Sequence, residues 1–415
     1  MLGERIRKLR KQKKMTLEAL AGKELTKGML SLIENNKAKP SMDSLAYIAQ
    51  QLDVEMSELL EDVSSQELRD ILEEAEKLYN SETDMKKTNT KQIIKLIDPY
   101  LANLTGGYES ARLLDIYFRC LYEEKNENWR DFANKAANLY EQLNITSKRA
   151  KIGIFRTHEK FIEHDYEQSL QIFLSERAKI EANEAYIDPM TKLDLDYHEA
   201  IFHFAVGDTN SATRVMENAI DFSKKHRIFY LIDDLYRIAA AHAMMEKDKV
   251  KNKYYLKKLK QYGEFADDTH SFLFYHLMEI ENLIADEQDY KKALKTIEQF
   301  LADSKVTDSY KPHFYLEKGK ALYGLKLFEE ALEWLEKINI PTSLHHPFDL
   351  SLFYVMDSYK ALCYDELNNW NKAYEFAKKA VENLAPFPQT HIKDFVTKTF
   401  ESIKANRNET KQVEE

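Results

Sequence analysis

The sequence predicts an all-α protein in which a small N-terminal domain of short helices precedes a long array of paired helices. Only 10 glycines and 8 prolines occur in 415 residues, which leaves little turn-forming sequence for a many-stranded sheet. Apolar residues recur at three- and four-residue spacing along most of the chain, as they do on the buried face of a helix. Residues 106–405 also contain a repeated unit, which predicts a helical solenoid.

Charge is distributed unevenly along the chain. The 60 Lys and Arg residues and the 70 Asp and Glu residues give a net charge of −10. Residues 1–41 nevertheless hold eleven basic and four acidic residues, a balance of +7, so the remainder carries −17. A cationic segment attracts phosphate groups and an anionic one repels them. Nucleic acid is therefore expected to bind the N-terminal part.

Cysteine usage and hydropathy predict a cytoplasmic protein. Cys120 and Cys363 lie far apart on helical patterns, so neither a disulfide framework nor a thiolate metal site is expected. No apolar run approaches the roughly 20 residues that cross a membrane, and the N-terminus lacks the apolar segment of a signal peptide. We expect no membrane partner, no metal and no cofactor.

Residues 1–62 are predicted to form a compact domain around one apolar centre. Its helices are expected at 2–13, 16–22, 26–35, 41–52 and 55–61. Thr16, Thr26 and Ser41 precede three of these helices, where a side-chain oxygen can accept a hydrogen bond from a free first-turn amide. Pro40 prevents the third helix from continuing.

Residues 63–105 are predicted to connect this domain to the repeats, and residues 406–415 to form a polar tail. Ser64 and Glu67 have the spacing of a capping box, which predicts a charged linker helix through Asn80. The polar stretch SETDMKKTNTK then separates this helix from the apolar segment IIKLIDPYLANL.

The repeated unit of residues 106–405 consists of a helix, a short polar turn and a second helix. The second helix carries a small residue three positions after an aromatic one, as in HDYEQSLQIF, EQDYKKALKTI, LKLFEEALEWL and NNWNKAYEFA. These positions recur at intervals of 36 to 43 residues with a mean of 40, at Ala133, Ser169, Ala212, Lys251, Ala293, Ala331 and Ala373. Lys251 departs from the pattern. Because a small residue lets two helices approach closely, the pairs are expected to stack into a right-handed, tetratricopeptide-like solenoid with a concave face.

The N-terminal domain resembles a known class of DNA-binding domain. Residues 16–60 are similar to the xenobiotic-response-element type of helix-turn-helix found in phage repressors. The similarity is carried by the run IEN that begins at Ile33, the loop from Lys37 to Ser41 and the closing MSELL. Repressors of this type usually carry Gln where this chain has Leu17. A phosphate contact at that place is therefore expected from backbone amides or neighbouring lysines.

Joined to tetratricopeptide-like repeats, this domain makes the chain similar to the peptide-sensing regulators of Gram-positive bacteria. That group contains the Rap, NprR, PlcR and PrgX proteins, and the length of this chain is nearest to NprR. The resemblance implies a quorum-sensing regulator that binds double-stranded promoter DNA and a short signalling peptide. It also implies a homodimer or higher oligomer whose assembly changes when the peptide binds in the concave face.

The segment LTKGMLSLIENNKAKPS is predicted to contain the DNA-reading helix and the basic loop after it. The residues expected to face outward are Lys27, Gly28, Met29 and Leu32. Lys27 can reach guanine acceptors, and Met29 or Leu32 can contact a thymine methyl group. Phosphate contacts are expected from Arg7, Arg10, Lys11, Lys14, Lys37 and Lys39. The alternative interpretation is a basic face that is merely solvated.

Peptide-binding residues are expected on the first helix of each pair, facing the hollow of the solenoid. They are Arg119, His158, Tyr197, Tyr236, Arg237, Asn282, Lys320 and Tyr323. The carboxamide of Asn282 can donate to and accept from one peptide unit. The cationic side chains can pair with a peptide carboxylate. For each residue the alternative is an ordinary packing or solvated position.

No catalytic site is predicted. In the segment HEAIFH, His198 and His203 are five residues apart, which places them about 140° apart around a helix, whereas a zinc-protease pair lies within about 40°. Asp194 and Asp196 are interpreted as exposed charges near a helix start. No glycine-rich phosphate loop, nucleophile elbow or paired-cysteine motif occurs.

Two other functions stay open from the sequence. One is a Rap-like protein that sequesters a sporulation phosphorelay response regulator, alone or in addition to binding DNA. The acidic repeats are compatible with such a protein partner. The other is a phage-type repressor without a peptide ligand.

Overall fold

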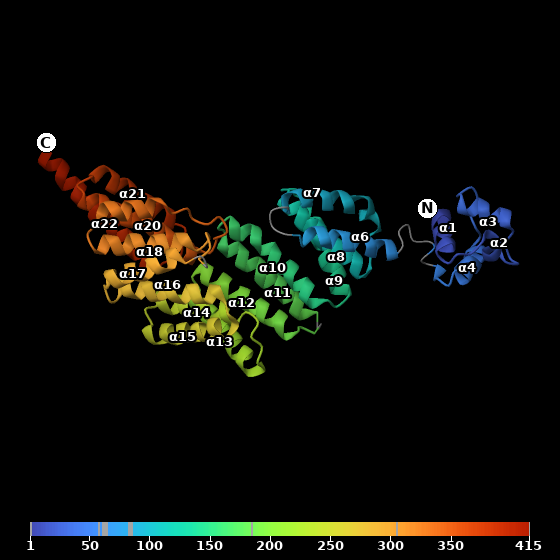
Figure 1. The fold of residues 1–415 in the computed structure, drawn as a ribbon, viewed down its shortest axis with the longest axis horizontal. Helices are drawn as coiled ribbons and strands as arrows, with labels where there is room; N and C mark the ends of the chain where they lie inside the picture. Colours follow the sequence, from blue (N-terminus) through green and yellow to red (C-terminus); the bar gives the residue numbers. More distant parts are fainter. Residues whose placement is uncertain are drawn as a thin grey trace. The chain divides into compact units, whose positions relative to one another are not determined.

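The structure is a computed structural model, and it describes residues 2–56, 59, 65–81, 86–183, 186–303 and 306–414. These residues form helices joined by turns, with no strand among them (Figure 1). The all-α prediction is therefore confirmed. The chain divides into two compact units, Met1–Ile152 and Gly153–Glu415.

The N-terminal domain contains α1 (Leu2–Gln12), α2 (Leu17–Ala21), α3 (Lys27–Glu34) and α4 (Met42–Gln51). The three predicted caps are confirmed. The side chain of Thr16 accepts a hydrogen bond from the amide of Ala19, and that of Thr26 accepts one from the amide of Met29, both at 3.1 Å. The side chain of Ser41 accepts from the amide of Ser44 at 3.2 Å. The predicted helix at 55–61 lies largely outside the described residues.

The core of this domain brings together one apolar stripe from each helix. Its fully buried members include Ile6, Leu20, Leu30, Ile33, Ile48 and Leu52. Helix α1 passes so close to the end of α3 that a Cβ at Gly3 would lie 2.0 Å from the carbonyl oxygen of Ile33. Glycine is therefore required at this contact.

The rest of the first unit is a bundle, and the predicted linker helix is part of it. It contains α6 (Ser65–Tyr79), α7 (Lys86–Ile97), η2 (Asp98–Asn103), α8 (Gly107–Glu123) and α9 (Trp129–Gln142). Helix α6 packs against both α7 and α8, and buries Ile71, Leu72 and Ala75. The division between the two compact units falls in α10 (Thr146–Ile162). The predicted domain bounds at residues 62 and 105 stay predictions. Ser64 of the predicted capping box lies outside the described residues.

The second unit continues the array of paired helices. It contains α11 (Tyr166–Ala182), α12 (Pro189–Val206), α13 (Thr209–His226), α14 (Ile232–Met245), α15 (Lys249–Ala266), α16 (Thr269–Ala285), α17 (Tyr290–Ala302), α18 (Lys311–Gly324), α19 (Phe328–Glu336), α20 (Pro347–Glu366), α21 (Trp370–Leu384) and α22 (His391–Glu414). The first helices of successive pairs, α12, α14, α16, α18 and α20, contact one another in order.

The turn inside a pair has the same construction in five pairs. A residue with positive φ reverses the chain, at His164, Gly207, Lys247, Gln288 and Asn368. The next residue is Asp or Asn, and its side chain accepts from an amide in the first turn of the second helix. The array is thus built from a short turn signal as well as from apolar spacing.

The predicted small positions are confirmed in six pairs and wrong in one. Ala133, Ser169, Ala212, Ala293, Ala331 and Ala373 have no exposed surface. Lys251, by contrast, is exposed. Because α15 begins at Lys249, its fourth residue is Asn252, which is buried and donates to the carbonyl oxygen of Ala240 at 2.9 Å.

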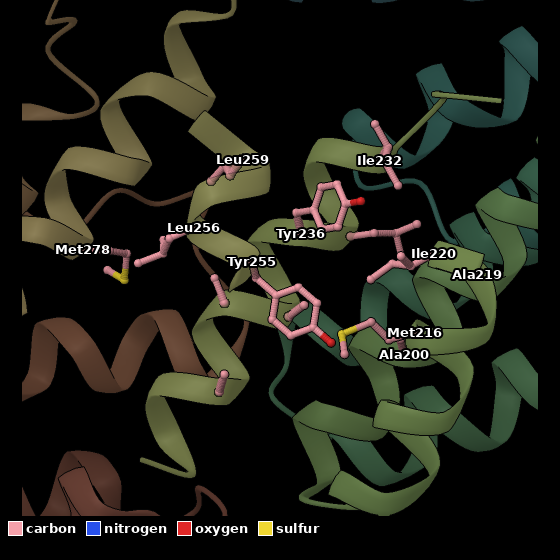
Figure 2. Close-up of a cluster of buried hydrophobic side chains, with 14 of the residues drawn as sticks. Ala200, Met216, Ala219, Ile220, Ile232, Tyr236, Tyr255, Leu256, Leu259 and Met278 are labelled. Carbon is pink, nitrogen blue, oxygen red and sulfur yellow. The ribbon is translucent and has the colours of Figure 1, made fainter. Parts of the chain in front are cut away.

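One core cluster of the second unit corrects the predicted position of Tyr236. Figure 2 shows Tyr236 among Met216, Ile220, Tyr255 and Leu259, between α13, α14 and α15. Its side chain is 6% exposed. Tyr236 is therefore a core residue and does not face outward from α14.

None of the helices in the described ranges combines the length and the apolar character needed to cross a membrane.

Candidate functional site

Helix α3 has one buried face and one open face. Leu30 and Ile33 are buried, whereas Met29 and Leu32 are 46% and 45% exposed. A Cβ at Gly28 would meet no atom within 4 Å. The predicted division between inward and outward residues is therefore what the structure shows. The outward stripe lies at the first two turns, where a recognition helix contacts base edges.

A buried ion pair holds α3 against α1. The Glu34 carboxylate accepts from Nε of Arg10 at 2.6 Å and from its terminal nitrogen at 2.8 Å. Arg10 also donates to the carbonyl oxygen of Met15 at 2.8 Å. The hydrogen bond to Glu34 raises the pKa of Arg10. Because Glu34 is buried and Arg10 is 11% exposed, this bidentate pair fixes the position of α3 on the domain.

This contact changes the role expected for Arg10. Its guanidinium is directed into the domain, so we assign it to positioning α3 and not to phosphate. Local sequence patterns do not reveal the pair, because 24 residues separate its members. The other predicted phosphate residues are all exposed: Arg7, Lys11, Lys14, Lys37 and Lys39.

A second, exposed ion pair joins α2 to the start of α3. Nζ of Lys27 lies 2.5 Å from the carboxylate of Glu18. The hydrogen bond from Lys27 lowers the pKa of Glu18. Glu18 therefore holds the side chain of the predicted base-reading lysine near the protein surface. Lys27 would have to leave Glu18 to contact a base.

Two of the predicted peptide residues come together in the second unit. Arg237 of α14 forms ion pairs with Asp234 and, at 3.6 Å, with Asp233, and it hydrogen-bonds Tyr310. Tyr197 of α12 lies within electrostatic range of Arg237 and of Asp349 on α20. We call this set the Arg237 cluster; its members are Tyr197, Asp233, Asp234, Arg237, Tyr310 and Asp349.

The Arg237 cluster has more acidic than basic groups. Burial raises the pKa of Asp234, and the nearby charge of Arg237 opposes this shift. Burial likewise raises the pKa of Asp349, and the nearby charges of His346 and Arg237 oppose this shift. The cluster therefore combines tyrosine hydroxyls, carboxylates and one guanidinium from α12, α14, the start of α18 and α20, and it can accept and donate hydrogen bonds.

Lys320 has a different role from the predicted one. It is 5% exposed, and its Nζ lies 2.9 Å from Glu281 and 2.8 Å from Glu317. Burial alone would raise the pKa of Glu281, but the charge of Lys320 lowers it to about 2. Burial and the charge of Glu281 raise the pKa of Glu317 well above its ordinary range. Lys320 therefore belongs to an internal triad in which the pKa values of the two carboxyl groups are shifted in opposite directions.

The remaining predicted peptide residues are dispersed. Arg119 lies in the first unit and binds Asp115 at 2.7 Å. His158 faces the ring of His345, 6.4 Å between centroids, and Tyr323 packs on Tyr359 at 5.7 Å. Asn282 is half-buried on α16.

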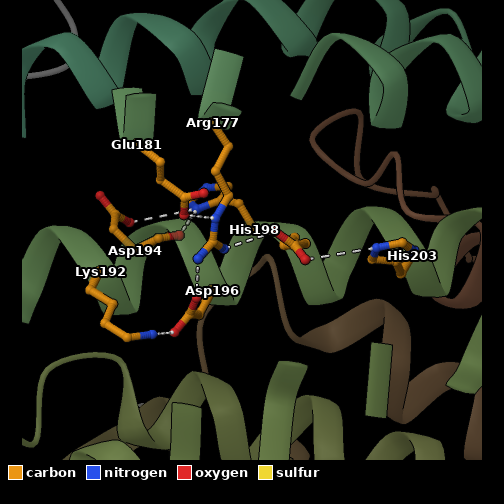
Figure 3. Close-up of polar contacts among 8 residues, drawn as sticks. Arg177, Glu181, Lys192, Asp194, Asp196, His198 and His203 are labelled. Carbon is orange, nitrogen blue, oxygen red and sulfur yellow. Dashed lines mark hydrogen bonds and ion pairs between the residues drawn. The ribbon is translucent and has the colours of Figure 1, made fainter. Parts of the chain in front are cut away.

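The segment around His198 and His203 forms an ion network. Asp196, predicted to be exposed, is buried and binds Arg177 at 2.7 Å as well as Lys192 (Figure 3). Arg177 reaches across from α11, which the sequence could not reveal. His198 contacts the carbonyl oxygen of Asp194 at 2.7 Å, whereas His203 is directed to Asp208 at 3.2 Å. Within the described part of the chain, no group of three or more His, Cys, Asp or Glu residues could hold a metal ion.

Comparisons with known proteins agree with the N-terminal architecture. Residues 3–65 match the family model of the helix-turn-helix domain. A comparison with curated proteins finds no match. The helix-turn-helix prediction is thus confirmed for the first part of the chain.

The solved structures that are similar to the chain include the following three. PlcR from Bacillus thuringiensis, in complex with the peptide PapR7 and DNA, has 19% identity and a TM-score of 0.29, covering 70% of this chain and 98% of PlcR. The SHP pheromone receptor Rgg2 from Streptococcus dysgalactiae has 15% identity and a TM-score of 0.31, covering 66% and 98%. The apo competence regulator ComR from Streptococcus vestibularis has 16% identity and a TM-score of 0.25, covering 97% of each. A particular likeness to NprR stays a prediction.

Replacing Glu34 with Gln should destabilise the N-terminal domain by about 3–5 kcal/mol, because the guanidinium of Arg10 would lose its buried charge partner. Amide hydrogen exchange of α1 and α3 in the full chain measures this loss. Glu18→Gln is the matched control, since it breaks an exposed pair in the same domain and should leave exchange unchanged. Equal exchange rates in the two variants would contradict the positioning role of Glu34.

Replacing Glu317 with Gln should remove a pH dependence of stability. Because the pKa of Glu317 is raised in the folded chain, its contribution is complete below the ordinary value of 4.5 and is lost as the pH rises toward the folded pKa. Between about pH 5 and pH 8, the free energy of unfolding measured by urea denaturation should therefore decline less in Glu317→Gln than in the wild type. The exposed Glu330→Gln should behave as the wild type. An unchanged decline in Glu317→Gln would show that Glu317 is already ionised.

Proposed function

We propose that this protein is a transcriptional regulator that binds promoter DNA through its N-terminal domain and a short signalling peptide through its helical repeats. The observation that carries the proposal is the open face of α3. Lys27, Gly28, Met29 and Leu32 lie outward there, within an N-terminal segment of +7 in a chain whose remainder carries −17.

The surroundings of α3 support a DNA interface. Five exposed cations flank it on α1, on the turn after α1 and on the loop after α3: Arg7, Lys11, Lys14, Lys37 and Lys39. Such residues contact phosphates and position the domain, while the outward stripe of α3 contacts the bases. A single domain of this size contacts few base pairs, so the protein binds a two-fold site as a dimer.

The Arg237 cluster supports peptide binding in the second unit. A peptide with free termini carries an ammonium group, a carboxylate and backbone donors and acceptors. Asp234 and Asp349 suit the ammonium, Arg237 suits the carboxylate, and Tyr197 can bind the backbone. For such a peptide to control DNA binding, it must prefer one arrangement of the protomers over another.

Selection of duplexes from a random-sequence pool by the full chain tests the DNA interface. Lys27→Ala should weaken the preference for guanine at one position of the selected site, by about 1–3 kcal/mol. Lys37→Ala should weaken binding to all duplexes about equally. It should also lower the slope of log affinity against log salt concentration by about one unit. Deletion of residues 1–62 should abolish selection. Identical effects of Lys27→Ala and Lys37→Ala on base preference would contradict the assignment of Lys27.

Native mass spectrometry of the full chain with a pool of short peptides tests the Arg237 cluster. The wild type should retain a subset of peptides, and Arg237→Ala or Tyr197→Phe should lose most of it. Arg214→Ala, which removes an exposed arginine from α13, is the matched control. Retention of the same subset by all three variants would place the peptide elsewhere.

A further inference from the structure

Helix α15 presents a basic surface on an acidic chain. Six lysines and one glutamate occur within its 18 residues. Lys253 and Lys257 are exposed, and among the described residues neither forms an ion pair. Lys249 and Lys251 are each bound to one carboxylate, Asp286 and Glu217, at 3.0 Å. The helix therefore retains a local excess of positive charge.

Three exposed apolar side chains lie between these lysines on one face of α15, two at its start and one in its last turn, and we call them the apolar stripe. Val250 is 81% exposed, Tyr254 is 44% exposed and Phe265 is 87% exposed. At 100° per residue, these three side chains fall within about 60° of one another on the helix surface. Lysines flank the stripe on both sides: Lys253 and Lys257 on one, Lys251 and Lys258 on the other.

The opposite face of α15 is packed into the core. Tyr255, Leu256 and Leu259 are buried there against α13, α14 and α16. The exposed stripe is therefore not needed to hold the helix in the fold. Exposed apolar side chains that share a helix face with cations can form part of an interaction surface.

The surface continues onto the end of α13, which lies beside α15 (Figure 1). The last turn of α13 and the turn that follows carry Lys224, Lys225 and Arg227, all exposed, and Phe229 is 61% exposed. Lys224 lies within electrostatic range of Tyr254. The same combination of cations and apolar side chains thus covers both second helices.

We propose that this α13–α15 surface binds an acidic amphipathic helix of another protein. An apolar stripe bordered by lysines is complementary to a helix whose apolar stripe is bordered by Asp and Glu, as in paired helices with charged flanks. Duplex DNA would match the lysines, but its apolar surface is confined to the grooves, and the charged backbone would face Val250 and Phe265. A lipid surface requires a wider apolar face than three side chains spread along an 18-residue helix. A second copy of α15 would bring lysines together.

A synthetic helix with Leu at heptad positions a and d and Glu at e and g is the probe. Fluorescence anisotropy should show that it binds the full chain, and that Phe265→Ala or the pair Lys253→Glu and Lys257→Glu weakens binding by about tenfold. The pair Lys291→Glu and Lys295→Glu, which changes the charge equally on exposed positions of α17, should leave binding unchanged. These side chains are exposed, so circular dichroism should show all variants folded.

Two results would overturn the proposal. One is equal binding of the probe to the α15 and α17 variants, or to a scrambled peptide of the same composition. The other is that the α15 variants still bind the peptide probe as the wild type does, but lose binding to phosphatidylserine vesicles or to a random duplex.

Discussion

The ion pair between Arg10 and Glu34 is the contact on which the proposed DNA-binding surface depends. Two charges are removed from water, which is costly unless the geometry and the remaining hydrogen bonds are good. Here the pair is bidentate, and Arg10 also binds the carbonyl oxygen of Met15. The pair and the apolar core fix α3 from one side, so its other side can stay open without the helix losing its position. A rigid helix with an open face is what base reading requires.

The N-terminal domain and the rest of the chain differ in net charge, and this difference favours different binding partners. The first 41 residues carry +7 and the remainder −17, so the N-terminal end attracts phosphate groups more strongly than the rest of the chain does as a whole. The α13–α15 surface is a local exception in the acidic part, and it differs from the N-terminal domain by its apolar stripe. A surface that combines lysines with exposed Phe265 is suited to a protein partner, whereas lysines around a polar helix start suit a phosphate backbone.

Sequence reasoning succeeded where the determining signal is local. Caps at Thr16, Thr26 and Ser41, and the buried small residues of the repeats, depend on neighbours within a few positions. It failed where the partner is distant: Glu34 binds Arg10, Asp196 binds Arg177, and Lys320 binds Glu281. Tyr236 and Arg237 show a third case. Neighbours on a helix point about 100° apart, so an error of one residue exchanges a core position such as Tyr236 for a partly exposed one such as Arg237.

Photo-crosslinking of the full chain to a selected duplex is the most direct test of the DNA-reading face. A benzophenone amino acid replaces Met29 on α3 in one variant and Phe265 on α15 in another. If the open face of α3 lies in the major groove, the duplex should crosslink at position 29 and not at position 265. Crosslinking at position 265 with none at position 29 would contradict the central claim.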